Sequence, residues 1–164
     1  MAKDLNEALN NVQIAYTELV QIADKIVQPY IKPMEDLIKK SNESTSRSNE
    51  SIRQLLYDLS VNACSFCEVK EKSALKLACA ETLKDEITAR KFNEAEGAIK
   101  VKENIALLES NYETLSQVLY NEVYSTLKTK LDSYYRFVDT LKSILISRAA
   151  DAKLSSNTNI GQEE

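Results

Sequence analysis

Glycine, proline, histidine and tryptophan are the residues that this chain has least of. Two Gly and two Pro occur among 164 residues, and neither His nor Trp occurs. An average soluble protein carries roughly 7% Gly and 5% Pro. Because tight turns between strands depend on these two residues, the composition argues against a sheet-based fold and favours a few long helices.

The absence of His excludes several kinds of chemistry. It removes the Ser-His-Asp and Cys-His routes to an activated nucleophile. It also removes the commonest general base near neutral pH and the commonest zinc ligand. We therefore expect a protein that is not an enzyme, with no catalytic residue and no cofactor.

The three cysteines give no sign of a disulfide framework or a metal site. Cys64 and Cys67 form a C-x-x-C pair, and Cys79 is the only thiol that could join them. An odd number of cysteines argues against a disulfide framework, and no His completes a zinc site. We expect three reduced thiols that pack on a helix as small apolar side chains, and no bound metal.

Charge and hydropathy limit the cellular setting. An apolar run of about 18 residues or more, which a membrane helix needs, does not occur. The first residues are too polar for a secretion signal, so we expect a cytoplasmic protein that does not bind membranes. The formal net charge of −4 argues against a simple nucleic-acid coat, which would be basic.

The N-terminal third of the chain predicts one helix and a linker. Apolar residues recur at heptad spacing over residues 3–40, and Pro29 and Pro33 predict a kink in this helix. Residues 41–51 are rich in Ser and Asn and predict a flexible linker. Within it, Ser48 and Ser51 lie where a helix start needs capping side chains.

The remainder predicts a long helical hairpin over residues 52–153. Its first arm covers residues 50–96 and ends near Gly97, and its second is one helix over residues 98–153. We expect the tail, residues 154–164, to be disordered. An apolar seam along the second arm is expected to serve packing and self-association, and its principal members are Tyr112, Leu115, Leu119, Leu127, Leu131, Val138, Leu141 and Leu145. The fold class is therefore all-α, a long hairpin or coiled coil with an additional N-terminal heptad helix as domain 1–40. We expect the whole protein to form a homo-oligomer.

Two basic clusters are candidates for binding nucleic acid. The first could contact phosphates, or it could be a solvated helix face with internal ion pairs. It comprises Lys70 and the five residues that we expect to contact phosphates, Lys72, Lys76, Lys84, Arg90 and Lys91. The second mixes basic and aromatic residues over 123–153, a composition that suits single strands. In the alternative interpretation its Tyr134 is a core residue, and its cations complement the helix dipole.

Several segments in this order resemble the UvsY-type recombination mediators of tailed phages, over about residues 60–150. The segments are an alanine- and lysine-containing helix, a charged break, two stretches of the long second arm and a final basic apolar run, at 71–78, 85–90, 119–122, 131–136 and 141–145. The resemblance implies a small helical protein that forms ring-like homo-oligomers and binds single-stranded DNA. It also implies contacts with a single-strand-binding protein and help in loading a RecA-like recombinase.

The resemblance carries over to one basic residue directly. In that family a Lys and an Arg on the alanine-rich helix contact DNA. Lys76 occupies the Lys position, whereas Ala78 stands at the Arg position, where Lys72 or Lys84 would have to substitute. A phage-encoded protein of this kind would work in the cytoplasm of the host cell.

Two functions therefore remain open from the sequence. The first is a single-stranded-DNA-binding recombination mediator. The alternative is a non-enzymatic coiled-coil protein that acts as a virion component, a scaffold or an inhibitor. Heptad seams fit both, so only the arrangement of the basic and aromatic residues can separate them.

Overall fold

The computed structural model describes residues 2–43 and 48–160, which form four helices and no strand. The helices are α1 (Ala2–Glu43), α2 (Asn49–Glu94), α3 (Ile99–Glu109) and α4 (Asn111–Ile160). The predicted all-α fold class is confirmed. Four residues of the predicted linker, 44–47, lie outside the described residues, as does the end of the predicted tail, 161–164.

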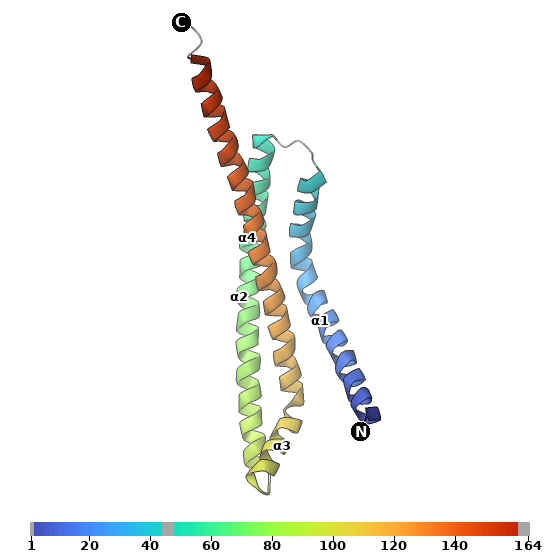
Figure 1. The fold of residues 1–164 in the computed structure, drawn as a ribbon. Helices are drawn as coiled ribbons and strands as arrows, with labels where there is room; N and C mark the ends of the chain where they lie inside the picture. Colours follow the sequence, from blue (N-terminus) through green and yellow to red (C-terminus); the bar gives the residue numbers. More distant parts are fainter. Residues whose placement is uncertain (1, 44–47, 161–164) are drawn as a thin grey trace. The chain divides into compact units, whose positions relative to one another are not determined.

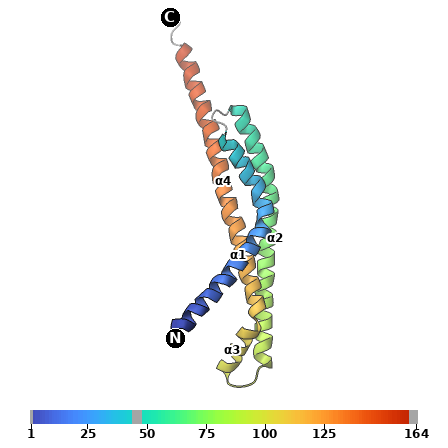
Figure 2. The same ribbon diagram turned by 90° about the vertical axis from the view of Figure 1, so that its right-hand side faces the viewer.

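Helices α2 and α4 form the expected hairpin. They run side by side in both views (Figures 1 and 2). Their contacts fix the direction, because Lys84 of α2 meets Gln117 of α4 and Leu59 of α2 meets Tyr134 of α4. Residue numbers rise along one helix as they fall along the other, so the pair is antiparallel.

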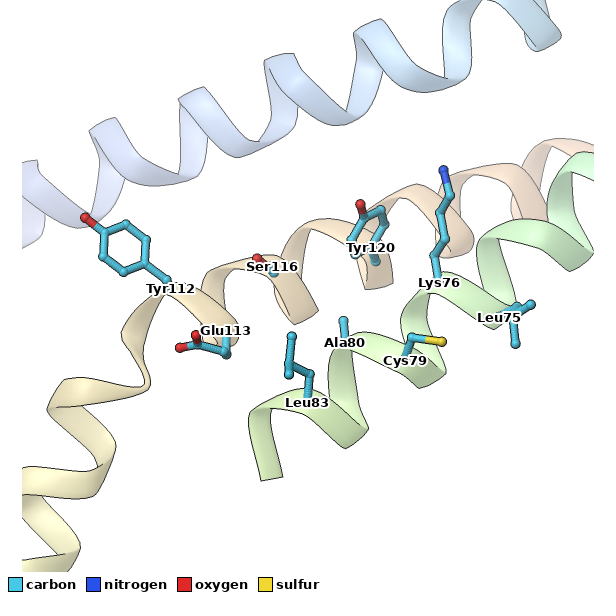
Figure 3. Close-up of a pocket in the computed structure, with 9 residues that line it drawn as sticks. All are labelled: Leu75, Lys76, Cys79, Ala80, Leu83, Tyr112, Glu113, Ser116 and Tyr120. Atoms are coloured by element: carbon cyan, nitrogen blue, oxygen red, sulfur yellow. The ribbon is translucent and has the colours of Figure 1, made fainter. Parts of the chain in front are cut away.

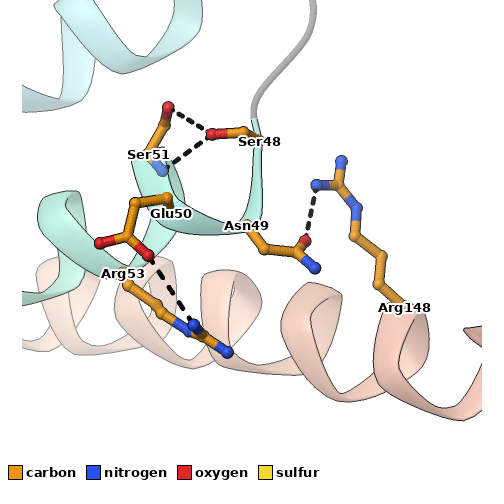
Figure 4. A network of polar contacts seen from close by, with 6 residues as sticks. All are labelled: Ser48, Asn49, Glu50, Ser51, Arg53 and Arg148. Atoms are coloured by element: carbon orange, nitrogen blue, oxygen red, sulfur yellow. Dashed lines mark hydrogen bonds and ion pairs between the residues drawn. The ribbon is translucent and has the colours of Figure 1, made fainter.

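The helix boundaries follow from local chemistry. The Oγ of Ser48 accepts a hydrogen bond from the Ser51 N–H at 3.1 Å, which is the N-cap geometry expected at the start of α2 (Figure 4). Gly97 separates α2 from α3 with φ of +113°, a conformation that side chains with a Cβ rarely adopt. Helix α1 continues through Pro29 and Pro33 to Glu43, as predicted for a continuation past the prolines.

The prediction of one unbroken helix over residues 98–153 is wrong at Ser110. This fully buried residue ends α3 with φ of −99° and ψ of 23°. Its Oγ donates to the Leu107 carbonyl at 3.4 Å, and its own carbonyl accepts from the Thr114 hydroxyl at 3.0 Å. These side-chain bonds satisfy polar groups at the break, which apolar spacing does not reveal. At the other end α4 continues to Ile160, beyond the start of the predicted tail.

The chain divides into two compact units, and α1, α2 and α4 contribute to both. Unit 1 comprises Met1–Tyr30 and Glu68–Lys128, and unit 2 comprises Ile31–Cys67 and Thr129–Glu164. Among the residues whose burial the structure describes, those buried in unit 1 are mostly small, and they are Ala23, Val27, Ser73, Ala80, Ala106, Ser110, Val123 and Leu127. Those of unit 2 are mostly large, and they are Ile31, Met34, Ile52, Leu59, Ala63, Phe66, Leu131, Tyr134, Val138 and Leu141.

Candidate functional site: a cationic and aromatic groove in unit 1

An open groove of about 440 Å³ lies between α2 and α4 within unit 1. We call it the α2–α4 groove. Side chains from α2 and α4 line it, and in Figure 3 they lie along both helices. Its nine lining residues are Leu75, Lys76, Cys79, Ala80, Leu83, Tyr112, Glu113, Ser116 and Tyr120.

Small side chains on α2 leave room for this groove. Ser73 and Ala80 are seven residues apart, which places them on one face of the helix, and both are buried. Ala80 also lines the groove, and its methyl group fills little of the space between the helices. The larger Leu75 and Leu83 stand at the edges and remain 66% and 50% exposed.

Lys76 and Tyr120 bring a cation and an aromatic ring together in the groove. The Lys76 Nζ lies 5.9 Å from the centre of the Tyr120 ring, within the range of a cation–π contact. Figure 3 shows both side chains extending to the same side of the two helices. Among the described residues, no carboxylate pairs with Lys76, so its charge is not neutralised.

Lys84 also has no carboxylate partner among the described residues. Its Nζ donates to the Gln117 Oε1 at 3.0 Å, across from α2 to α4. A side-chain amide orients the ammonium group but does not cancel its charge. Lys76 and Lys84 are eight residues apart on α2, so about two helical turns separate them on nearly the same face.

The other predicted phosphate contacts differ from these two. Lys72 pairs with Glu68 at 2.5 Å, and Lys91 pairs with Glu109 at 3.1 Å and Glu94 at 3.5 Å. The hydrogen bond from Lys72, with its charge, lowers the pKa of Glu68. In the same way Glu68 raises the pKa of Lys72.

The Lys91 pKa is raised mainly by its hydrogen bond to Glu109. Arg90 is exposed and makes no ion pair with a described residue. The structure thus divides the predicted set into two carboxylate-paired lysines, two lysines with uncharged partners and one exposed arginine.

Two cations of the second basic cluster make contacts within unit 2. Lys130 pairs with Glu35 at 2.7 Å, and the Arg148 guanidinium donates to the Asn49 Oδ1 at 3.2 Å (Figure 4). Tyr134 is 1% exposed and donates to the Leu59 carbonyl at 2.6 Å, which confirms its interpretation as a core residue.

The residues of the apolar seam predicted along the second arm differ in how far they are buried. The structure buries Leu127 at the end of unit 1, and in unit 2 Leu131, Val138 and Leu141. Leu119 and Leu145 are half-buried. Leu115 is exposed, and Tyr112 is 82% exposed at the edge of the groove. The last two are free to contact another molecule.

The thiols remain free, as predicted, but they are less buried than core residues. Cys64 and Cys79 are exposed, and the Cys67 Sγ lies 3.1 Å from the Tyr135 hydroxyl. In the described part of the chain, no three His, Cys, Asp or Glu side chains come together as metal ligands. No described helix is both long enough and apolar enough to cross a membrane.

Sequence reasoning did not assign the α4 side of the groove. Tyr112, Ser116 and Tyr120 are spaced four residues apart, so they share one helix face, and Glu113 lies beside them. That spacing is visible in the sequence, but it does not reveal which residues of α2 lie opposite. No protein-family model, curated protein or solved structure matches this chain.

Proposed function

We propose that this protein is a non-enzymatic, single-stranded-DNA-binding recombination mediator of the phage type, which assists the loading of a RecA-like recombinase. The observation that carries the DNA-binding part is the pairing of Lys76 with Tyr120 in an open groove, with Lys84 on the same helix. Both lysines keep a positive charge that no described carboxylate neutralises.

These groups suit an unpaired strand. Lysines attract backbone phosphates irrespective of sequence, and aromatic rings stack with any base. A net charge of −4 makes one chain a weak ligand for DNA. Self-association would place several such sites on one strand and multiply the weak contacts into useful affinity.

The test is anisotropy of labelled single-stranded DNA at low and high salt, with two double variants of equal charge. Lys76→Ala with Lys84→Ala removes the uncompensated lysines, and Lys72→Ala with Lys91→Ala removes the carboxylate-paired ones. We expect the first pair to weaken binding strongly and to reduce the salt slope by about 1.4, since each phosphate contact contributes roughly 0.7. The second pair should change both much less.

Two results would overturn this assignment. One is an absence of salt-sensitive binding by the folded wild-type protein at low salt. The other is an equal loss in the two double variants, because total charge rather than the groove would then determine binding.

The mediator role rests on the resemblance to the UvsY-type family. It implies that the recombinase and a single-strand-binding protein are partners, in the cytoplasm of the host if the protein is phage-encoded. Its test is assembly of recombinase filaments on DNA coated with single-strand-binding protein. Faster assembly with this protein supports the role, and an unchanged rate contradicts it.

A non-enzymatic coiled-coil structural or interaction protein is the second candidate. The observation that favours it is the set of large apolar side chains that unit 1 leaves in solvent, including Leu108 at 77% and Tyr112 at 82% exposed. Exposed apolar clusters commonly mark interaction surfaces. Light scattering that finds a stable oligomer, combined with no DNA binding, would favour this second function.

A further inference from the structure

We infer that the α2–α4 groove is a subsite for one unpaired nucleobase, which stacks on Tyr120 while Lys76 holds the adjoining phosphate. This inference rests on the proposed DNA binding and identifies the feature that is recognised. It predicts selectivity for single strands, because a base within a duplex has no free face to offer.

The size and lining of the groove suit a flat, mainly apolar ligand. Its volume of about 440 Å³ falls within the range of sites that hold small molecules, roughly 300–1,000 Å³. Leu75, Ala80 and Leu83 supply apolar contacts from α2, and Tyr120 supplies a ring from α4. A chain of phosphates and sugars alone would gain little from such a surface.

The charged groups of the groove determine which end of it the phosphate of the nucleotide occupies. Lys76 lies at the Tyr120 end, whereas Glu113 lies seven residues earlier on α4. Seven residues of helix span about 10 Å, so the cation and the carboxylate mark opposite ends. A phosphate is attracted to the Lys76 end and repelled from the Glu113 end, and the base then lies between them.

Binding requires only a small change in the groove. The Lys76 Nζ now lies 5.9 Å from the centre of the Tyr120 ring, and a cation–π contact at an exposed site is weak. Stacking of a base on the same ring is the stronger interaction. The flexible Lys76 side chain can therefore leave the ring for the phosphate as the base takes its place.

The experiment compares two strands with the same number of phosphates. One is oligo-deoxythymidine, and the other is an abasic strand of equal length in which each base is absent. We expect the wild-type protein to prefer the strand with bases. Tyr120→Leu should reduce that preference by roughly 5- to 150-fold, which is the usual effect of losing one stacking ring. Tyr120→Phe should retain it, because the ring remains.

A control keeps this test specific to the groove. Tyr57→Leu removes another exposed tyrosine, which belongs to unit 2 and does not line the groove, and should leave both affinities unchanged. A 2-aminopurine base placed in the strand supplies a second measurement. Its fluorescence should be quenched on binding to the wild type and to Tyr120→Phe, but not to Tyr120→Leu.

Failure of the inference can be told apart from failure of the proposed function. If neither strand binds, DNA binding itself is wrong and the subsite is wrong with it. If both strands bind equally, DNA binding stands through phosphates alone and the subsite is overturned. If bases matter but folded Tyr120→Leu, checked by circular dichroism, behaves as the wild type, bases are held elsewhere and the subsite is again overturned.

Discussion

Unit 1 and unit 2 share three helices, yet they bury different kinds of side chain. The core of unit 2 contains Phe66, Leu59 and Tyr134, all nearly inaccessible to solvent. The core of unit 1 relies on small residues such as Ala80 and Ala106. Large buried side chains contribute most to hydrophobic stabilisation, so we expect the core of unit 2 to contribute more stability than the core of unit 1.

The large side chains that unit 1 does not bury lie on its surface. Leu75, Leu83, Leu108 and Tyr112 are all at least half exposed. A region that exposes such residues gains little stability from them and has them available for binding. Unit 2 also exposes large apolar side chains, among them Tyr57 at 65% and Ile146 at 71%, so the two units differ chiefly in the size of the side chains that they bury.

The largest expected effect is a difference in unfolding free energy between a variant of unit 2 and a variant of unit 1. Phe66→Ala in unit 2 should lower the free energy of unfolding by about 3–5 kcal/mol, because it leaves a cavity in place of a side chain that is 2% exposed. Leu83→Ala in unit 1 removes a half-exposed side chain and should cost less than about 0.5 kcal/mol. Urea unfolding followed by circular dichroism measures both, and similar losses in the two variants would contradict the division.

A smaller effect is expected on the pH dependence of stability, through the buried Tyr134 hydroxyl in the core of unit 2. Burial raises the pKa of the Tyr134 hydroxyl, and the neighbouring Tyr135 adds to this. Because the folded-state pKa lies above the unfolded value of about 10, this hydroxyl contributes no pH-dependent loss below pH 10. Above pH 10 the unfolded state releases the proton first, so stability should fall as the pH rises.

Tyr134→Phe isolates that contribution. The variant loses the 2.6 Å hydrogen bond to the Leu59 carbonyl, at a cost of about 0.5–1.5 kcal/mol near neutral pH. It should also lose part of the alkaline decline, which thermal unfolding measured from pH 8 to 11 would reveal. An alkaline decline that is identical in wild type and variant would show that other groups cause it.

The fold was largely predictable because the signals for it are local. The scarcity of Gly and Pro, the heptad spacing and the Ser48 cap each act within a few residues, and they correctly indicate helices and their starts. The break at Ser110 was not predictable, since a buried serine surrounded by apolar spacing looks like an ordinary helix position.

The candidate site was predictable only in part. Lys76 and Lys84 were named from spacing along one helix, together with Lys72 and Lys91. Which lysines lack a carboxylate partner depends on what lies nearby in space, and Glu109 and Gln117 lie on helices that the sequence does not align with α2. Tyr120 was missed as a site residue for the same reason.

The smallest expected effect concerns the affinity of the groove in unit 1 for DNA rather than the stability of the protein. Glu113→Gln removes the one carboxylate that lines the groove. A charge about 10 Å from a bound phosphate contributes about 0.4 kcal/mol in water, so the variant should bind single-stranded DNA about twofold more tightly at low salt. High salt should abolish the gain, because screening acts over about the same distance.

The control for this variant lies on the same helix, outside the groove. Glu122→Gln makes the same change of charge at an exposed position that does not line the groove, and it should alter DNA affinity less. Both variants should unfold at the same urea concentration as the wild type, since neither side chain is part of a core. If Glu113→Gln weakened binding instead, its carboxylate would be a direct contact to the ligand, and the orientation assigned to the nucleotide would have to be reversed.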